Sequence, residues 1–407
     1  MTFGGDTGSG PRPMDVTQIF GLLSGLLVLA FIANRLFRIT RVPDLVILLL
    51  TGLLLGPIFK LVDVSRFATF THVLGDLALI LILFEGGLEL RLKDTLRHFP
   101  GGVLLAFLGY GLSFGSVAAA AHWAMHLGWH AAFLLGGVFG CTSSTVIMPV
   151  LQQMHVREPV KLTLLLESAI GDIIGVLTVS SLITITPDQP VAKLFLSGLA
   201  VRVVIAMVLA IIAGIIWSRL WRSISSWRFA NALSFGIVLG IYAGTQAAGG
   251  SGLLAVLAFG LTLGNLPGQS IDSEPGMLVF HSELSFLVRS FFFVLLGAEV
   301  EFVGIGYAWP MLGILGALVV SRALAVWISR IALHDITADD RETIFFMLPR
   351  GLITAVLAVE VTNARGDEFS FLPAMALTIM VVTSALLVVG SVRAGRHATA
   401  AEEVTAA

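Results

Sequence analysis

Apolar segments long enough to cross a membrane follow one another along almost the whole chain, and this pattern constrains the fold most. A spanning helix needs about 20 mainly apolar residues. The links between these segments are short, and the alternating pattern of β-strands is missing from the sequence. The sequence therefore predicts an all-α membrane protein with about thirteen transmembrane helices. The predicted helices cover residues 18–36, 43–60, 71–91, 101–124, 130–152, 161–186, 192–219, 229–248, 250–267, 281–301, 304–333, 341–362 and 370–392.

Charged residues make up only 12% of the chain, against about 25% in a soluble domain. This scarcity indicates a multi-pass membrane protein, and no polar stretch is long enough for a separate soluble domain. We expect a flexible N-terminal tail (1–17), a transmembrane domain (18–392) and a short cytoplasmic C-terminal tail (393–407). The formal net charge of -2 gives no reason to expect a nucleic-acid partner.

The distribution of basic residues predicts the orientation of the chain. Cytoplasmic links carry an excess of Lys and Arg. Of the 24 basic residues, fifteen fall in alternate links that include the C-terminal tail, and five fall in the links that alternate with them. The N-terminus is therefore expected outside and the C-terminus in the cytoplasm, with the chain in the cell inner membrane or plasma membrane.

Glycines spaced four residues apart occur in several predicted helices. Such spacing lets helix backbones approach closely in lipid, and ordinary helix packing is the expected role. The pairs and the triplet are Gly52 and Gly56, Gly111 and Gly115, Gly236, Gly240 and Gly244, and Gly260 and Gly264.

The segment LLLESAIGDIIGVL places Glu167 and Asp172 inside an apolar helix. An ionisable group at membrane depth costs a few kcal/mol, so it needs a partner or a function. Five residues rotate a helix by about 500°, so the two carboxylates point about 140° apart and face different neighbours. Ser168 is four residues before Asp172 and shares its face. A hydroxyl and a carboxylate together suit a small cation, whereas a purely structural salt bridge is the alternative interpretation for Asp172.

Three arginines also lie within apolar segments: Arg289, Arg322 and Arg350. A guanidinium keeps its proton in a protein, so a buried arginine needs an acceptor. We expect Glu167 to be neutralised permanently by an arginine, which leaves Asp172 free to exchange partners. The sequence does not decide between Arg322 and Arg350 as the partner.

Two predicted helices contain breaks. Hydroxyl residues from Thr142 to Thr145 interrupt GGVFGCTSSTVIMPV, and Pro349 and Gly351 interrupt LPRGLITA. Broken spanning helices are tolerated where the freed backbone lines a cavity or binds an ion. The breaks fall in the fifth and twelfth spans, which correspond if two six-span repeats flank a central seventh span. Matched breaks of this kind point to the ion site of a transporter.

Several motifs together resemble the monovalent cation:proton antiporter superfamily, and most closely its NhaP-type sodium/proton exchangers. They are FEGGLELRLKDTLRH, the broken fifth span, the ES-x-x-x-D pattern, FFFVLLGAEV and PRGLITAVLA, and the resemblance runs from about residue 18 to 392. It implies inverted repeats, two crossing unwound helices, a core domain and a dimerisation domain, hence a homodimer. It also implies a secondary transporter rather than an enzyme, without a cofactor, whose partners are monovalent cations, protons and the bilayer.

The resemblance also implies roles for individual residues. Asp172 would bind either the cation or a proton, with the Thr142 backbone and the Ser168 hydroxyl as further cation ligands and Ser143 beside them. The residues expected to support the site are Glu167, Arg350, Arg322 and Glu85. With one titrating acid, the expected exchange is electroneutral, with sodium as the first choice of cation.

The resemblance departs from the NhaP pattern at two points. NhaP-type proteins usually carry Thr-Asp-Pro in the fifth span and Asn-Asp in the sixth, where this chain has Thr-Ser-Ser at 142–144 and Gly-Asp at 171–172. The SSTV run is more similar to potassium/proton exchangers of the Kef type, so potassium/proton antiport stays an alternative.

A channel or sensor with the same fold also stays open. A remote alternative is an intramembrane aspartyl protease, but its Gly-x-Gly-Asp motif is incomplete at 169–172. Asp76 is the only candidate for its second acid.

Overall fold

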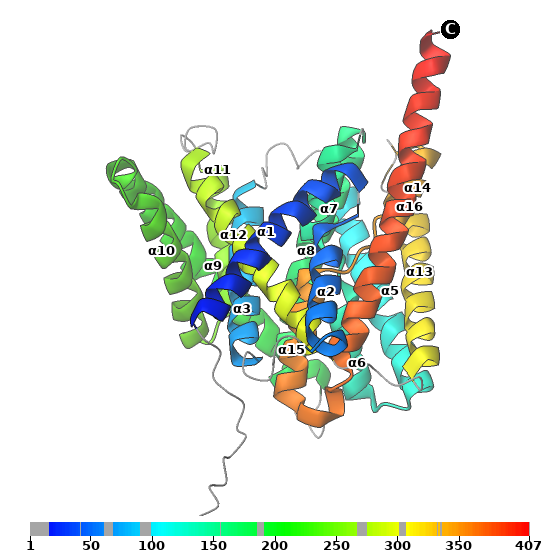
Figure 1. Cartoon of the computed structure of the whole chain (residues 1–407), viewed down its shortest axis with the longest axis horizontal. Helices are drawn as coiled ribbons and strands as arrows, with labels where there is room; N and C mark the ends of the chain where they lie inside the picture. The colour runs from blue at the N-terminus through cyan, green and yellow to red at the C-terminus, as the bar shows by residue number, and fades with distance from the viewer. Residues whose placement is uncertain are drawn as a thin grey trace, which may run out of the picture.

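Every regular element in the described part of the chain is a helix (Figure 1). The structure is a computed structural model that describes residues 16–40, 42–60, 68–89, 99–154, 156–184, 191–266, 275–300, 307–331, 333 and 336–406. The helices are α1 (Val16–Thr40), α2 (Asp44–Leu53), α3 (Ala68–Glu89), α5 (Phe99–Met125), α6 (Trp129–Gly140), α7 (Ser144–Gln153), α8 (Glu158–Thr184), α9 (Val191–Ile224), α10 (Ala230–Ala247), α11 (Gly252–Asn265), α12 (Pro275–Glu299), α13 (Ala308–Ser329), α14 (Ala338–Phe346), α15 (Leu352–Arg365) and α16 (Leu372–Ala406). A π-helical turn (Leu54–Ile58) extends α2, and a 3-10 turn (Gly366–Phe369) follows α15.

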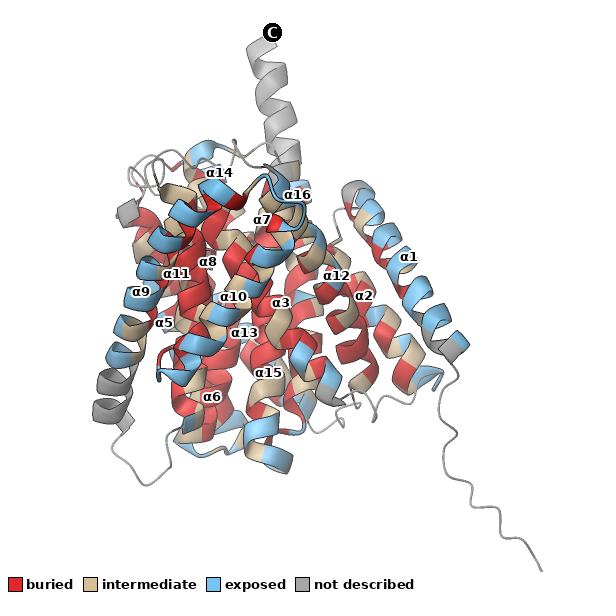
Figure 2. Ribbon diagram, turned by 90° about the vertical axis from the view of Figure 1, so that its left-hand side faces the viewer, coloured by how far each residue is buried: buried red, intermediate tan, exposed pale blue. Residues whose placement is uncertain are grey.

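By length and composition, eight of the described helical segments are apolar enough to cross a membrane, and three shorter helices are also apolar. Buried residues concentrate in the middle of the bundle, whereas α1 and α9 carry many exposed residues (Figure 2). Many of these exposed residues on α9 are large and apolar, including Val204, Ile212 and Ile216. An exposed apolar surface of this kind suits a lipid environment and supports the prediction of a multi-pass membrane protein.

The predicted domain boundaries differ slightly from the helix ends. Residues 1–15 of the predicted N-terminal tail lie outside the described residues, and α1 already begins at Val16. The predicted C-terminal tail begins at Arg393, but α16 continues as a helix to Ala406 and projects beyond the rest of the bundle (Figure 1).

The helices pack as two groups. One group consists of α5, α6, α7, α8, α13, α14, α15 and α16, in which α5 packs against α6, α8 and α13, and α16 packs against α14 and α15. The other consists of α1, α2, α3, α9, α10, α11 and α12, in which α2 packs on α12 and α3 packs on α11 and α12. We call them the core group and the scaffold group.

Some of the glycine pairs mark the closest helix contacts of the scaffold group. A Cβ atom added to Gly52 would lie 2.9 Å from the backbone nitrogen of Ala298 on α12. One added to Gly260 would lie 3.2 Å from the backbone nitrogen of Leu88 on α3. By contrast, a Cβ on Gly111 or Gly240 would meet no atom of the described residues within 4 Å. Spacing alone therefore did not distinguish packing glycines from outward-facing ones.

Both predicted breaks are present in the core group. Helix α6 ends at Gly140 and α7 begins at Ser144, with extended backbone at Cys141 and Ser143 between them. Helix α14 ends at Phe346, and α15 begins at Leu352. The two breaks touch, because the backbone N–H of Ser143 donates to the carbonyl of Pro349 over 3.0 Å. Glycine is needed at Gly351, where an added Cβ would lie 2.6 Å from that of Ser143.

Candidate functional site

Helix α8 carries both buried acids of the core group. Glu167 and Asp172 are 2% and 1% exposed, and they contact different elements, as the helical rotation between them predicts. Glu167 faces α13, whereas Asp172 faces the start of α7. The two carboxylates therefore lie in separate environments within one helix.

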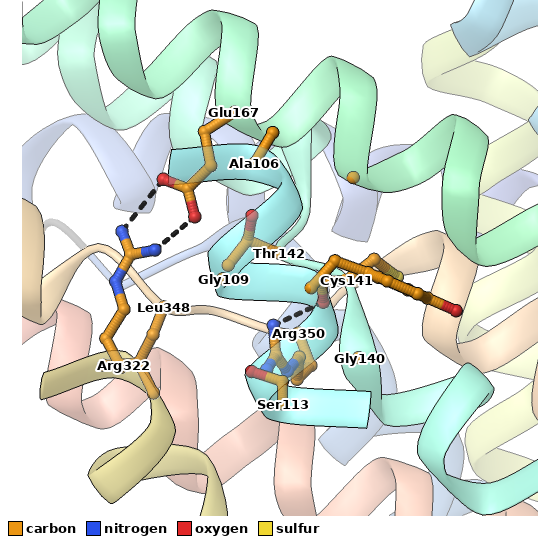
Figure 3. Close-up of a pocket in the computed structure, with 12 residues that line it drawn as sticks. Ala106, Gly109, Ser113, Gly140, Cys141, Thr142, Glu167, Arg322, Leu348 and Arg350 are labelled. Atoms are coloured by element: carbon orange, nitrogen blue, oxygen red, sulfur yellow. Dashed lines mark hydrogen bonds and ion pairs between the residues drawn. The ribbon is translucent and has the colours of Figure 1, made fainter. Parts of the chain in front are cut away.

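Glu167 forms a buried ion pair with Arg322 of α13 (Figure 3). Both carboxylate oxygens accept from the guanidinium, the second over 3.1 Å. Arg322 also donates to the carbonyls of Ile344 and Met347, over 2.8 and 2.7 Å, where α14 ends. A buried ion pair needs such additional hydrogen bonds to offset the cost of removing both charges from water. The structure thus pairs Glu167 with Arg322, the choice that the sequence left open.

Arg350 serves a different acceptor. Its guanidinium donates to the backbone carbonyl of Cys141 in the other break (Figure 3). The backbone N–H of Arg350 donates to the hydroxyl of Thr383 over 3.0 Å. The side chain is 1% exposed. A carbonyl at the end of α6 has no partner within its helix, so Arg350 provides the missing donor.

Asp172 is bound by Ser144, the first residue of α7. The Ser144 hydroxyl donates to Oδ2 of Asp172 over 2.6 Å, and the Ser144 backbone N–H lies 3.4 Å from the same oxygen. The other oxygen, Oδ1, is buried without a hydrogen-bond partner among the described residues. An unsatisfied buried carboxylate oxygen is costly, so this atom is available to a proton or a cation.

Ser144 was missed as a site residue in the sequence. The sequence predicts the break from Thr142 to Thr145, but the family resemblance points to Thr142 and Ser143 as its site residues. The signal for Ser144 is its position where the helix resumes after the break. The first N–H groups of a helix have no partner within it and can donate to an anion such as a carboxylate.

The other predicted ligands have these positions. Ser168 is fully buried, and its hydroxyl donates to the carbonyl of Leu165 on its own helix over 3.1 Å. The Ser143 hydroxyl lies 2.8 Å from that of Thr145. Thr142 lines a cavity of about 10 Å³ together with Cys141 and Arg350 of the two breaks and Glu167 of α8; this is roughly the space of one water molecule.

A much larger cavity of about 1010 Å³ lies between the two helix groups. Helix α7 contributes Ser144 and Thr145 to its wall, and α3 contributes Glu85 and Glu89. Glu85 accepts a hydrogen bond from the hydroxyl of Ser282 on α12. The cavity therefore reaches the serine that binds Asp172 and is lined by acids from the scaffold group.

Two further charged residues lie away from Asp172. Arg289, the third arginine of the apolar segments, is only half-buried; it lines the large cavity and pairs with Asp44 over 3.2 Å. Asp76, the candidate second acid of a protease, belongs to α3 in the scaffold group and lies 3.5 Å from a ring nitrogen of His72. Neither contact involves the core group that holds Asp172.

Comparison with known proteins gives a consistent set of similarities. Residues 26–393 match the family model described as the transmembrane sodium/hydrogen exchanger. The K(+)/H(+) antiporter NhaP2 of Shewanella sp. (strain ANA-3) is 28% identical over 398 residues, which cover 93% of this chain and 67% of that protein. The Na(+)/H(+) antiporter 1 of Methanocaldococcus jannaschii is 26% identical over 371 residues, covering 86% and 84%.

The solved structures support the fold. The sodium proton antiporter MjNhaP1 from Methanocaldococcus jannaschii at pH 8 superimposes with a TM-score of 0.76 at 21% sequence identity. The match covers 93% of this chain and 96% of that chain. At this level of identity, the similarity establishes the fold and not the transported ion.

Proposed function

The chain belongs to the transmembrane sodium/hydrogen exchanger family, and from that premise we propose that it exchanges protons for a monovalent cation across a membrane. It acts as a secondary transporter rather than an enzyme, and Asp172 carries the cation or the proton. Ser168, Thr142 and Ser143 stay proposed site residues on the ground of the family resemblance.

The observation that carries the proposal is the environment of Asp172. Its carboxylate is buried at a helix break, is bound by Ser144 and keeps one oxygen that has no partner among the residues that the structure describes. The other buried acid of α8, Glu167, is already neutralised by Arg322. One acid is thus held permanently and the other is free to bind an ion.

Competition for Asp172 is sufficient for antiport. The carboxylate binds a proton or a cation, and in either case the site is neutral. A bare carboxylate is costly to move across the hydrophobic barrier, so only the loaded forms cross. We propose electroneutral exchange of one cation for one proton, in which the core group moves against the scaffold group to alternate access.

The proposed architecture has thirteen spans in two inverted repeats, with the α6–α7 and α14–α15 breaks as crossing unwound helices. Its support is the matched packing of α2 on α12 and α3 on α11, together with the contact between the breaks. The scaffold group would form the interface of a homodimer. With the N-terminus outside, the large cavity opens toward the cytoplasm, because it is lined by α7 and by residues near the C-terminal ends of α1 and α3.

Sodium is the first proposed cation and potassium is the alternative. The similar proteins include a potassium/proton and a sodium/proton antiporter by name. The site offers one free carboxylate with oxygen ligands around it, a set that suits hard monovalent cations without choosing between them.

The test is proton flux in proteoliposomes driven in turn by sodium, lithium and potassium gradients. We expect cation-dependent flux in the wild type and its loss in Asp172→Asn, with flux retained in Asp339→Asn, which removes an exposed carboxylate from α14. Flux that persists in Asp172→Asn would place the carrier elsewhere. Conduction beyond turnover rates would favour a channel, and a rate that follows an imposed membrane potential would contradict electroneutral exchange.

A further inference from the structure

We propose that Ser144 positions the transported cation at Asp172 by exchanging its hydrogen bond to the carboxylate for a ligand bond to the ion. This inference rests on the proposed function and assigns a residue that the family resemblance did not point to. Its class of ligand is a small monovalent cation held by oxygen atoms.

The geometry singles out Ser144 among the hydroxyl residues of the break. Its hydroxyl lies 2.6 Å from Oδ2 of Asp172, whereas the Ser143 hydroxyl faces Thr145 at 2.8 Å. Ser143 is also packed against Gly351 of the other break. Of the two adjacent serines, only Ser144 therefore directs its hydroxyl to the carboxylate.

Ser144 also lies between Asp172 and the large cavity through which an ion would enter. Asp172 is 1% exposed, and the residues that line the large cavity include Ser144 but not Asp172. An ion that enters this cavity of about 1010 Å³ meets Ser144 before it reaches the carboxylate. The hydroxyl is thus placed both to admit the cation and to bind it.

A hydroxyl suits this exchange because it has one donor and two acceptor lone pairs. In the ion-free state the O–H donates to Oδ2 and stabilises the charged carboxylate. When a cation binds between Asp172 and Ser144, the hydroxyl rotates and presents a lone pair to the ion. The side chain satisfies the carboxylate in one state and coordinates the cation in the other, without a change in backbone.

Removing this hydroxyl has two opposite effects at one carboxylate. The cation loses a ligand and binds more weakly, whereas the proton binds more tightly because the charged carboxylate has lost a donor. In Ser144→Ala we therefore expect the apparent KM for the cation to rise about ten-fold, as for one hydrogen bond to a charged group. The pH of half-maximal exchange should move upward in the same variant.

The experiment compares the wild type with Ser144→Ala, Ser144→Thr and Ser181→Ala. Ser181→Ala is the matched control, because Ser181 is a buried serine on the same helix as Asp172, nine residues further along. Proton flux in proteoliposomes gives KM, the maximal rate and the pH profile. In parallel, the rise in melting temperature with sodium, lithium or potassium concentration reports binding without turnover.

We expect Ser144→Ala to need about ten times more cation for the same thermal stabilisation, and Ser144→Thr to restore most of it. Ser181→Ala should follow the wild type in both assays. An unchanged KM, pH profile and cation titration in Ser144→Ala would overturn the inference and leave Ser144 a structural residue. If Ser144→Ala is folded but inactive, the rise in melting temperature with cation concentration alone decides whether the inference holds. If the wild type shows no cation-dependent proton flux at all, the proposed function itself is refuted.

Discussion

The guanidinium of Arg350 donates a hydrogen bond to the backbone carbonyl of Cys141, so a side chain from one interrupted helix completes the broken end of the other. The contact is reinforced by the bond from the Ser143 N–H to the Pro349 carbonyl. Two breaks that would each leave buried backbone groups without partners therefore satisfy one another. This mutual bonding fixes the position of Ser144, and with it the environment of Asp172.

Replacing Arg350 should destabilise the core group. In Arg350→Ala the Cys141 carbonyl loses its donor inside the bundle, which costs about 1–3 kcal/mol for the unsatisfied group, and the lost side chain leaves a cavity. We expect a clearly lower melting temperature for the purified protein, with a smaller effect in Arg350→Lys. A melting temperature equal to that of the wild type in Arg350→Ala would show that this contact contributes nothing to stability.

The Glu167–Arg322 pair should behave as a coupled unit. Removing either partner leaves a buried charge without compensation, at a cost of about 3–5 kcal/mol. The double variant Glu167→Gln, Arg322→Gln should cost less than the sum of the single variants. The control is the exposed Arg393–Glu342 pair at 3.4 Å, for which a coupling of about 0–1 kcal/mol is expected. Thermal unfolding of the four variants of each cycle measures both couplings, and simple additivity at Glu167 and Arg322 would contradict the prediction.

Glycines with the same spacing should respond differently to alanine. Gly52→Ala places a methyl group against the backbone of α12 and must push the helices apart, so the melting temperature should fall. Gly111→Ala on α5 meets no atom within 4 Å in the part of the chain that the structure describes. It should be neutral or stabilising because alanine favours a helix by about 0.5–1 kcal/mol over glycine. Equal effects of the two substitutions would mean that the approach of α2 to α12 is looser than the structure has it.

The start of α14 should depend on Asp340. This carboxylate accepts from Arg157 over 2.6 Å and from the N–H of the helix-capping residue Thr337 over 2.9 Å. Asp340→Ala removes both contacts, and we expect a loss of about 1–2 kcal/mol, typical of a lost helix cap. Its neighbour Asp339 is exposed in the same turn and provides the control Asp339→Ala. A similar melting temperature for the two variants would argue against a bond between the α7–α8 link and α14.

Much of the site could be predicted because the free-energy cost of burying a charged side chain is set within its own helix. Glu167 and Asp172 stand out since a carboxylate in an apolar helix needs a partner wherever that helix lies. Their different neighbours followed from the helical rotation alone. The partner of Glu167 did not follow from the sequence, because Arg322 and Arg350 both lie in apolar segments and carry the same guanidinium group. The role of Ser144 required knowing which of two adjacent hydroxyls faces α8 after the break.

The sequence by itself determined the helical membrane fold, the positions of the breaks and the two acids, because apolar length, prolines and buried charges act within a single segment. Only the tertiary structure decided which arginine binds Glu167, which serine meets Asp172 and which glycines lie at helix contacts. These choices depend on the rotation of each helix about its axis and on what packs against it. That rotation is set by contacts between residues far apart in the chain, which no local pattern records.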